Sequence, residues 1–326
     1  MWNIGNIQIE SHVVLAPMAG ITSLGYREFM HQFGVGANVT EMVSDMGLIY
    51  GNKETSEYIA FSSDCYPTGV QLFGHDPVCL AKAAKIALEA NPDIAYFDVN
   101  MGCPVPKVVK TGAGSCLMQT PKLCGDIVRA IKEASGLPVT AKIRLGWDEK
   151  SINYLEVIKE LENAGVAAIG IHARTRKECY SGLPHWDMLK GLRKQMNVPL
   201  IVSGNIYTLE DAISAIEITG ADAVMVARGG MGNPYLITQI DHYYKTGEKL
   251  EGPSVKEQID WCQELGDYLI KEKGEGKAMR LYRGIASKFF SGFPNAKAIK
   301  NRLSTELNTR EDLEKILIDV KQQLEL

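Results

Sequence analysis

The chain has 326 residues, of which 45% are hydrophobic and 23% are charged, and its formal net charge at pH 7 is −4. This composition is typical of globular proteins and excludes disordered, collagen-like and low-complexity chains. No apolar run approaches the ~18 to 20 residues of a membrane-spanning helix, and the first residues lack the basic flank and apolar core of a signal peptide. We therefore expect a soluble cytoplasmic protein.

Eight short runs rich in valine, isoleucine and alanine follow one another, and turn residues and a stretch of helical period come after most of them. The interval after the second run shows the weakest helical pattern. Nearly continuous apolar strands that alternate with helices indicate parallel strands buried on both faces, and eight such units predict a (β/α)8 TIM barrel. A doubly wound sheet is the alternative, although no G-x-G-x-x-G follows the first run. The runs are 13–18, 39–43, 68–73, 95–100, 139–145, 167–173, 199–204 and 223–228.

Polar residues occur near the ends of the third to sixth runs, where apolar residues would be expected in a barrel. Each one alone has an ordinary structural explanation, such as a salt bridge or a hydrogen bond. Pairs spaced i, i+2 share one face of a strand, and the carboxyl ends of all barrel strands meet at one end of the barrel. Their coincidence on four neighbouring strands therefore predicts a cleft that binds a polar ligand. The residues are Gln71, Asp98, Asn100, Lys142, Arg144, His172 and Arg174.

The seventh and eighth runs end in VSGNI and VARGGMGNP, which are glycine-containing turns that lead towards helices. In such barrels these two loops often bind phosphate, because small residues let backbone N–H groups approach the anion. By themselves, the glycines are also consistent with simple tight turns. We expect the phosphate contacts at Gly204, Asn205, Ala227, Arg228 and Gly229.

The turn after the first run, APMAG, carries Pro17, Met18 and Ala19, which are suited to lie flat against an aromatic ring. Together with a phosphate site, this turn indicates a phosphorylated cofactor with an aromatic head, and flavin mononucleotide (FMN) fits. Lys142 would face the N1/O2 edge of the ring and stabilise the negative charge of reduced flavin. Gln71 would hydrogen-bond to the pyrimidine side.

The segment after the fourth run, DVNMGCPVPKVVKTGAGSCLM, places Cys103 at a strand end over the expected cleft. A free cysteine is usually a small buried hydrophobic residue, but this position favours a chemical role. A thiol near its ordinary pKa of about 8.5 is mostly protonated at neutral pH and can donate a proton to carbon. None of the seven cysteines forms a C-x-x-C pair, so we expect neither a disulfide framework nor a metal site.

The strand pattern stops after about residue 245, and a linker leads into four helical segments near 254–273, 276–290, 294–306 and 309–325. We predict two domains, a catalytic barrel at 1–245 and a helical domain at 246–326. Within the second domain, residues 271–302 hold nine Lys and Arg against two Glu. A solvated helical face is the ordinary explanation of such a run.

The chain resembles the tRNA-dihydrouridine synthases, most of all their bacterial B-type subgroup. The resemblance rests on APMAGIT, QLFG, the NMGCP block with its downstream K-x-x-K-x-G-A-G-S, KIRLGWD, IHARTR, SGNI and GADAVMVARGGMGNP. It is strong over about 10–245, whereas the helical tail matches only in general character. It implies an FMN-bound barrel joined to a tRNA-binding helical domain, with NADPH as the reductant. The implied reaction is the reduction of the C5=C6 bond of a tRNA uridine.

The resemblance also implies roles for single residues. Hydride would pass from reduced FMN to uracil C6, and Cys103, at the position of the family's proton donor, would protonate C5 from the opposite face. Asn100 and Arg174 stand at positions that contact the target base or the flavin. The FMN contacts fall on Pro17, Met18, Ala19, Gln71, Lys142, His172, Ser203, Gly204, Asn205, Ala227 and Arg228.

A stacked uridine must leave the RNA stack to reach such a pocket, so contacts elsewhere on the RNA are needed. This requirement gives the basic stretch a purpose, and we expect Lys277, Arg280 and Arg283 to contact RNA phosphates. No membrane and no protein partner is implied.

Two other classes of protein stay open. The first is a flavin barrel enzyme that acts on a free small molecule, such as a dihydroorotate dehydrogenase-like or enoate reductase enzyme. The second is a non-catalytic RNA-binding protein with a decayed flavin pocket.

Overall fold

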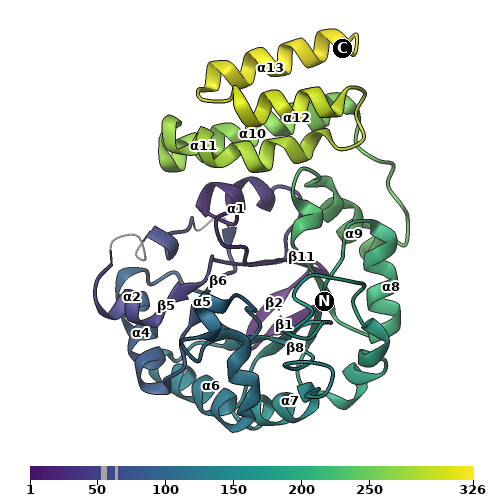
Figure 1. Cartoon of the computed structure of the whole chain (residues 1–326). Helices are drawn as coiled ribbons and strands as arrows, with labels where there is room; N and C mark the ends of the chain where they lie inside the picture. Colours follow the sequence, from purple (N-terminus) through teal and green to yellow (C-terminus); the bar gives the residue numbers. More distant parts are fainter. Residues whose placement is uncertain (53–56, 63–64) are drawn as a thin grey trace.

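The computed structural model describes residues 1–52, 57–62 and 65–326. Eight parallel strands form a closed barrel, because β4 pairs with both β3 and β6 (Figure 1). The expected (β/α)8 barrel is confirmed, and an open doubly wound sheet is excluded. The strands are β3 (Val13–Leu15), β4 (Ala37–Val39), β6 (Thr68–Phe73), β7 (Tyr96–Asn100), β8 (Val139–Arg144), β9 (Ala168–His172), β10 (Leu200–Ser203) and β11 (Ala223–Val226).

The strand expected at 39–43 is the one whose bounds differ in the structure. The run 39–43 predicted a single strand, but the structure has β4 and then a separate short strand, β5 (Val43–Ser44), which pairs with the end of β6. Between them lies Thr40, a buried residue whose hydroxyl accepts a hydrogen bond from the N–H of Gln71 at 3.2 Å and donates one to the carbonyl of Glu41 at 2.8 Å. These side-chain hydrogen bonds interrupt the ladder between the two short strands.

Helices surround the barrel as an outer layer (Figure 1). Between β9 and β10 the chain forms only two 3₁₀ turns, Trp186–Leu189 and Leu192–Gln195, in place of a long helix. The short helix α2 occupies the interval that showed the weakest helical pattern. The helices are α1 (Leu24–His31), α2 (Asp45–Ile49), α4 (Pro77–Ala90), α6 (Pro121–Ser135), α7 (Tyr154–Asn163), α8 (Leu209–Thr219) and α9 (Tyr235–Thr246).

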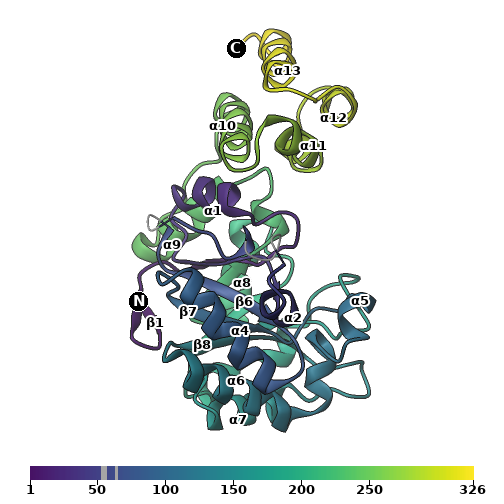
Figure 2. The same ribbon diagram turned by 90° about the vertical axis from the view of Figure 1, so that its left-hand side faces the viewer.

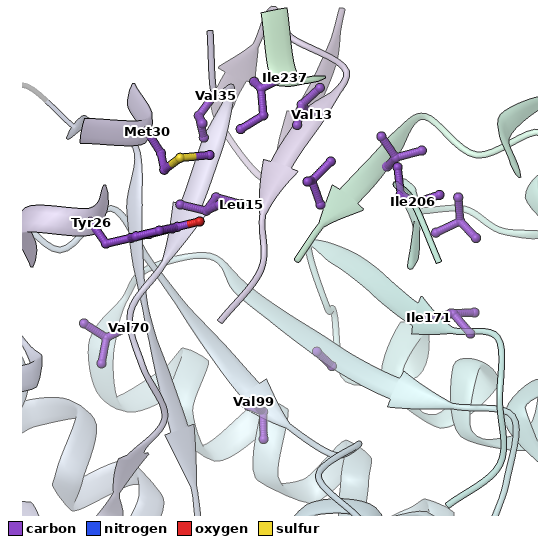
Figure 3. Packing of buried hydrophobic residues seen from close by; sticks show 14 of the residues in the cluster. Val13, Leu15, Tyr26, Met30, Val35, Val70, Val99, Ile171, Ile206 and Ile237 are labelled. Carbon is purple, nitrogen blue, oxygen red and sulfur yellow. The ribbon is translucent and has the colours of Figure 1, made fainter. Parts of the chain in front are cut away.

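Alternation along the strands separates two apolar layers. Val13 and Leu15 of β3 point outwards and pack with Tyr26 and Met30 of α1 (Figure 3). Val14, between them, joins the cluster inside the barrel, together with residues of a hairpin made by β1 (Trp2–Ile4) and β2 (Ile7–Ile9). The hairpin lies on the opposite side of the barrel from the short helix α5 (Pro106–Val109), which follows β7 (Figure 2). The amino ends of the strands are thus closed by apolar packing, and the carboxyl ends remain for a site.

The tail after the barrel is helical, as the sequence predicts. It consists of α10 (Val255–Lys273), α11 (Glu275–Ala286), a 3₁₀ turn at Ser287–Phe290, α12 (Ala296–Thr305) and α13 (Arg310–Gln323). Helix α10 lies on α1, and one apolar cluster extends from the barrel helices into the tail. A domain boundary at 245/246 therefore stays a proposal. Within the described residues, no helix is long and apolar enough to cross a membrane.

Candidate active site

A cavity of about 470 Å³ opens at the carboxyl ends of the strands. Residues on or directly after seven of the eight barrel strands line it, and the loop between β4 and β5 contributes Met42. Cys103, Asn100 and all eleven residues expected to contact FMN are in this lining. They are Pro17, Met18, Ala19, Gln71, Lys142, His172, Ser203, Gly204, Asn205, Ala227 and Arg228.

A chain of hydrogen bonds fixes the floor of the cavity. Asp98 accepts hydrogen bonds from the hydroxyl of Thr140 and from Nε2 of Gln71, each at 2.6 Å. Asn100 donates to Oε1 of Gln71 at 2.9 Å, and its own Oδ1 accepts from the backbone N–H of Cys103 at 2.9 Å. Burial raises the pKa of Asp98, while the hydrogen bonds from Gln71 and Thr140 oppose this rise. The network fixes the orientation of both amides and links the barrel floor to the backbone of Cys103.

Cys103 lies at the end of β7 with its backbone held on both sides. Its carbonyl accepts hydrogen bonds from the N–H of Ser115 at 3.1 Å and from the hydroxyl of Ser115 at 2.9 Å. Burial raises the pKa of the Cys103 thiol, and nearby Arg144 and Lys142 lower it by less. The thiol therefore keeps its proton at neutral pH, which suits a general acid and does not suit a nucleophile.

Two basic groups of the cavity lining, Lys142 and His172, have strongly displaced pKa values. Burial, with a smaller contribution from Arg144, lowers the pKa of Lys142 to about 8. Burial and the cations around it hold the pKa of His172 well below its ordinary value, so this imidazole is neutral. Arg174 Nη1 lies 3.0 Å from Nε2 of His172. Because a guanidinium can only donate, Nε2 accepts, and the ring proton is on Nδ1.

The loops after β10 and β11 interlock at positions that only glycine fits. A Cβ on Gly229 would lie 1.9 Å from the carbonyl oxygen of Ile206, and Gly204 has a φ of +119°. In the described part of the chain, no acceptor takes the backbone N–H groups of Gly204, Asn205, Arg228 or Gly229. Unpartnered N–H groups beside an arginine are the chemistry of an anion site.

Arg228 is held between two aromatic rings at the edge of this site. Its guanidinium carbon lies 5.3 Å from the ring centre of Tyr180 and 5.7 Å from that of Tyr207. No aspartate or glutamate is among the described residues that line the cavity, whereas Lys142, Arg144 and Arg228 are. The cavity therefore favours an anionic ligand with an apolar body, which is what a flavin phosphate is.

Arg174, expected to contact the base or the flavin, is not among the residues that line the cavity. Arg174 is fully buried behind the cavity lining, and its guanidinium donates to the carbonyls of Ser181 and Gly182, to Oδ1 of Asn205 and to His172. These bonds brace the wall of the cavity, and a contact of Arg174 with base or flavin stays a prediction.

Arg144, expected in the cleft, and Tyr180, which no sequence pattern indicated, both line the cavity. Arg144 donates to the carbonyls of Gly102, Thr175 and Cys179, and its guanidinium carbon lies 5.5 Å from the ring centre of Tyr180. Tyr180 belongs to the irregular loop after β9, where no period in the sequence shows which side chain turns inwards.

The three expected RNA contacts lie outside the cavity on α11, and they are not equivalent. Arg280 is exposed, and Nζ of Lys277 lies 3.8 Å from a carboxylate oxygen of Glu57. Arg283 donates to the carbonyl of Leu307 at 2.8 Å and to Oδ1 of Asn308 at 2.6 Å, so its guanidinium braces the tail. Figure 2 shows α11 and α12 on the same side of the molecule as α5.

The chain matches the family described as "Dihydrouridine synthase (Dus)" over residues 14–325. It belongs to the dihydrouridine synthase family. A probable tRNA-dihydrouridine synthase of Rickettsia conorii is 38% identical over 297 residues, which cover 91% of this chain and 89% of that protein. The tRNA-dihydrouridine synthase B of Pseudomonas putida is 36% identical over 307 residues, which cover 94% of this chain and 90% of that protein. The resemblance to B-type enzymes is confirmed.

Solved structures share the barrel at low sequence identity. An old yellow enzyme homologue from Zymomonas mobilis has a TM-score of 0.53 and 12% identity, covering 78% of this chain and 94% of that one. Histamine dehydrogenase from Rhizobium sp. 4-9 has a TM-score of 0.53 and 15% identity, covering 82% of this chain and 50% of that one. These likenesses show a common fold. The match to the dihydrouridine synthase family includes the helical tail.

Proposed function

We propose that this member of the dihydrouridine synthase family is an FMN-dependent, NADPH-using enzyme that reduces the C5=C6 bond of a tRNA uridine. The observation that carries the proposal is the meeting in one cavity of a protonated thiol, a cationic wall and an anion-binding pair of loops. The names of the relatives agree with it, and tRNA would be the partner.

The residues of the cavity fit FMN. Unpartnered N–H groups of the loops after β10 and β11, together with Arg228, would hold the phosphate. Pro17, Met18 and Ala19 would pack against the ring, with Lys142 at its N1/O2 edge and Gln71 at its pyrimidine side. Bound in this way, the flavin would supply the hydride for C6 of the uracil.

The protein's own chemical contribution is a proton and a fixed electrostatic field. Cys103 would donate the thiol proton to C5 of the uracil, and the thiolate would then recover a proton from solvent. Lys142 and Arg144 place positive charge where negative charge develops during the reduction. Asn100 and Ser115 fix the backbone of Cys103, so the thiol needs little reorganisation to reach the carbon.

The substrate would be one uridine turned out of the RNA stack, at a cost of a few kcal/mol that contacts elsewhere on the RNA offset. We assign those contacts to the exposed basic side chains of residues 271–302. These residues belong to a second domain, which we place at 246–326. We expect the protein to act in the cytoplasm. The family match extends to residue 325, so the tail belongs to the same conserved unit as the barrel. This supports tRNA over a free small molecule as the substrate.

Replacement of Cys103 tests the proposal. Cys103→Ala should still bind FMN and accept electrons from NADPH, because the thiol supplies only the proton. Dihydrouridine formation should fall by ~10²- to 10⁴-fold, the usual contribution of a general acid. Cys116→Ala is the matched control, since Cys116 is half-buried and does not line the cavity. Undiminished dihydrouridine formation by Cys103→Ala would exclude the role of Cys103 as the acid. In a separate test on the wild type, reduction of the flavin by NADH as fast as by NADPH would exclude selectivity for NADPH.

A further inference from the structure

Four charged side chains lie near one another where the end of α10 reaches the barrel, outside the cavity, and two of them, Glu272 and Lys273, form a direct ion pair. Arg27 and Glu41 belong to the barrel and are buried, while the side chains of Glu272 and Lys273 belong to the tail and are 16% and 18% exposed. Two cations and two anions balance, and in this poorly solvated place their mutual attraction is strong. Burial raises the pKa of Glu41, and the N–H of Gly20, Lys273 and Arg27 oppose the rise.

This cluster connects the tail to the loop after β3. Glu272 accepts hydrogen bonds from the hydroxyl of Ser23 at 2.7 Å and from the N–H of Gly25 at 2.9 Å, at the start of α1. Lys273 donates to the second oxygen of Glu272 at 2.7 Å. Glu41 accepts the N–H of Gly20, the residue that directly follows the cavity-lining Ala19. The loop that we assign to the flavin ring is therefore anchored to α10.

The tail also touches the loop after β11. A Cβ on Gly232 would lie 2.3 Å from the backbone carbon of Lys288, so these two backbones are in direct contact. Gly232 follows Met231, which lines the cavity next to the loop that we assign to the phosphate. Likewise, a Cβ on Gly25 would lie 2.7 Å from the carbonyl oxygen of Tyr268 on α10. Figure 1 shows α1 lying directly below the tail. The tail thus contacts both loops expected to hold the cofactor.

We propose that Glu41, Glu272 and Lys273 are positioning residues that link the seating of the flavin in the barrel to the docking of the RNA-holding tail. The inference rests on the proposed function, because it needs both ligands. A change in the position of the tail moves the first residues of α1 and, through Glu41, the turn at Gly20. Because such a linkage is reciprocal, bound tRNA tightens flavin binding by the same factor by which flavin tightens tRNA binding.

The experiment measures the dissociation constant of FMN for the full-length chain by flavin fluorescence, with and without saturating tRNA. In the wild type, tRNA should tighten FMN binding about five- to tenfold, a common size for such coupling. Lys273→Met should retain FMN binding but reduce this ratio to about twofold or less, and Lys273→Arg should restore it. Lys85→Met is the control, because Lys85 is an exposed lysine of α4 that lies outside the stretch assigned to the RNA contacts.

Stacking of the uridine on the flavin contributes equally in Lys273→Met and Lys85→Met, so the difference between them reports the charged cluster. Equal ratios in the two variants, or a wild-type ratio of one, would overturn the linkage. If the wild type still forms dihydrouridine in that case, the proposed function stands. A wild type that binds no FMN or no tRNA contradicts the proposed function itself. Glu272→Gln serves as a second variant. If the tightening of FMN binding by tRNA falls while the melting temperature is unchanged, the residue acts by positioning and not through general destabilisation.

Discussion

At the scale of single residues, Lys142 is a charged group whose position in the cavity costs the folded protein stability. Lys142 lies among buried groups, and its pKa falls to about 8 because burial disfavours the charged form. Asp98 compensates only in part, since its carboxylate is engaged by Gln71 and Thr140. A group that costs stability in this way is typical of a functional site, where an anionic ligand later offsets the cost.

Replacement of this lysine should reveal the cost. Between about pH 8 and 10.5 the unfolded chain binds a proton at Lys142 that the folded chain has released, so the stability of the wild type rises with pH over that range. Lys142→Met should therefore stabilise the flavin-free protein by up to ~3 kcal/mol below pH 8, since each unit of pKa displacement is worth about 1.4 kcal/mol. The gain should decline between pH 8 and 10.5.

The measurement is chemical denaturation of flavin-free protein across this pH range, together with FMN titration. Lys142→Met should bind FMN more weakly although it is more stable. Lys85→Met, at an exposed position of α4, provides the control and should alter neither property. A Lys142→Met protein that is less stable than the wild type at pH 7 would contradict the assignment of Lys142 as a cation that costs stability.

At the scale of elements, α11 and α12 present the basic surface of the tail on the side of the cavity. Arg280 and Lys297 are exposed and have no ion-pair partner among the described residues. A hollow on α12 is lined by Asn295, Lys297, Ala298, Lys300, Asn301 and Ser304. Amides, hydroxyls and lysines together suit RNA phosphates and riboses. Arg283 is half-buried, and its Nε and Nη2 hold Leu307 and Asn308 in place, so its contact with RNA stays a prediction.

Charge reversal on this surface should weaken tRNA binding without affecting the chemistry in the barrel. We expect Arg280→Glu combined with Lys297→Glu to reduce the slope of log affinity against log salt by about two, near one unit for each lost phosphate contact. Oxidation of NADPH in the absence of RNA should be unchanged. Lys85→Glu combined with Lys159→Glu carries the same charge change on α4 and α7 and should leave the slope unaltered. Identical slopes for the two double variants would remove α11 and α12 from the RNA interface.

At the scale of the whole molecule, α11 and α12 lie on the same side as α5 (Figure 2), and α5 directly follows the cavity-lining segment after β7, so one large ligand can engage both parts. Contacts far from the reacting base help to hold the base in the cavity, and an enzyme of this design depends on them. A free nucleoside has the base but not the remote contacts. The arrangement therefore distinguishes an RNA-modifying enzyme from a reductase of small molecules.

Turnover of free uridine gives the corresponding prediction. The kcat/KM for uridine or orotate should be lower than that for unmodified tRNA by at least ~10³-fold, because the remote binding energy is lost. The measurement compares dihydro-product formation by mass spectrometry on tRNA, uridine and orotate under the same reducing conditions. Comparable values for tRNA and for either small molecule would favour the alternative class.

The sequence by itself determined the barrel, the helical tail and most of the cavity. Runs of valine and isoleucine separated by helical stretches leave few other packings, and residues at strand ends meet at one end of a closed barrel whatever the loops do. This is why Cys103, Lys142 and the residues after the seventh and eighth runs were predicted at one site, and why all of them line one cavity. For the second run, local side-chain hydrogen bonds at Thr40 outweighed strand propensity, and that boundary was wrong.

Only the tertiary structure decided which charged groups are free and which are engaged. Arg174 and Arg283 have the sequence character of ligand-binding residues, yet carbonyls from other loops occupy their guanidinium groups. Tyr180 enters the cavity from an irregular loop, and Glu272 meets Ser23 and Gly25 across more than two hundred residues of chain. Such partners depend on how distant segments pack, because a buried charge takes whichever hydrogen-bond acceptor or counter-charge the fold places beside it, and no local pattern in the sequence encodes that neighbour.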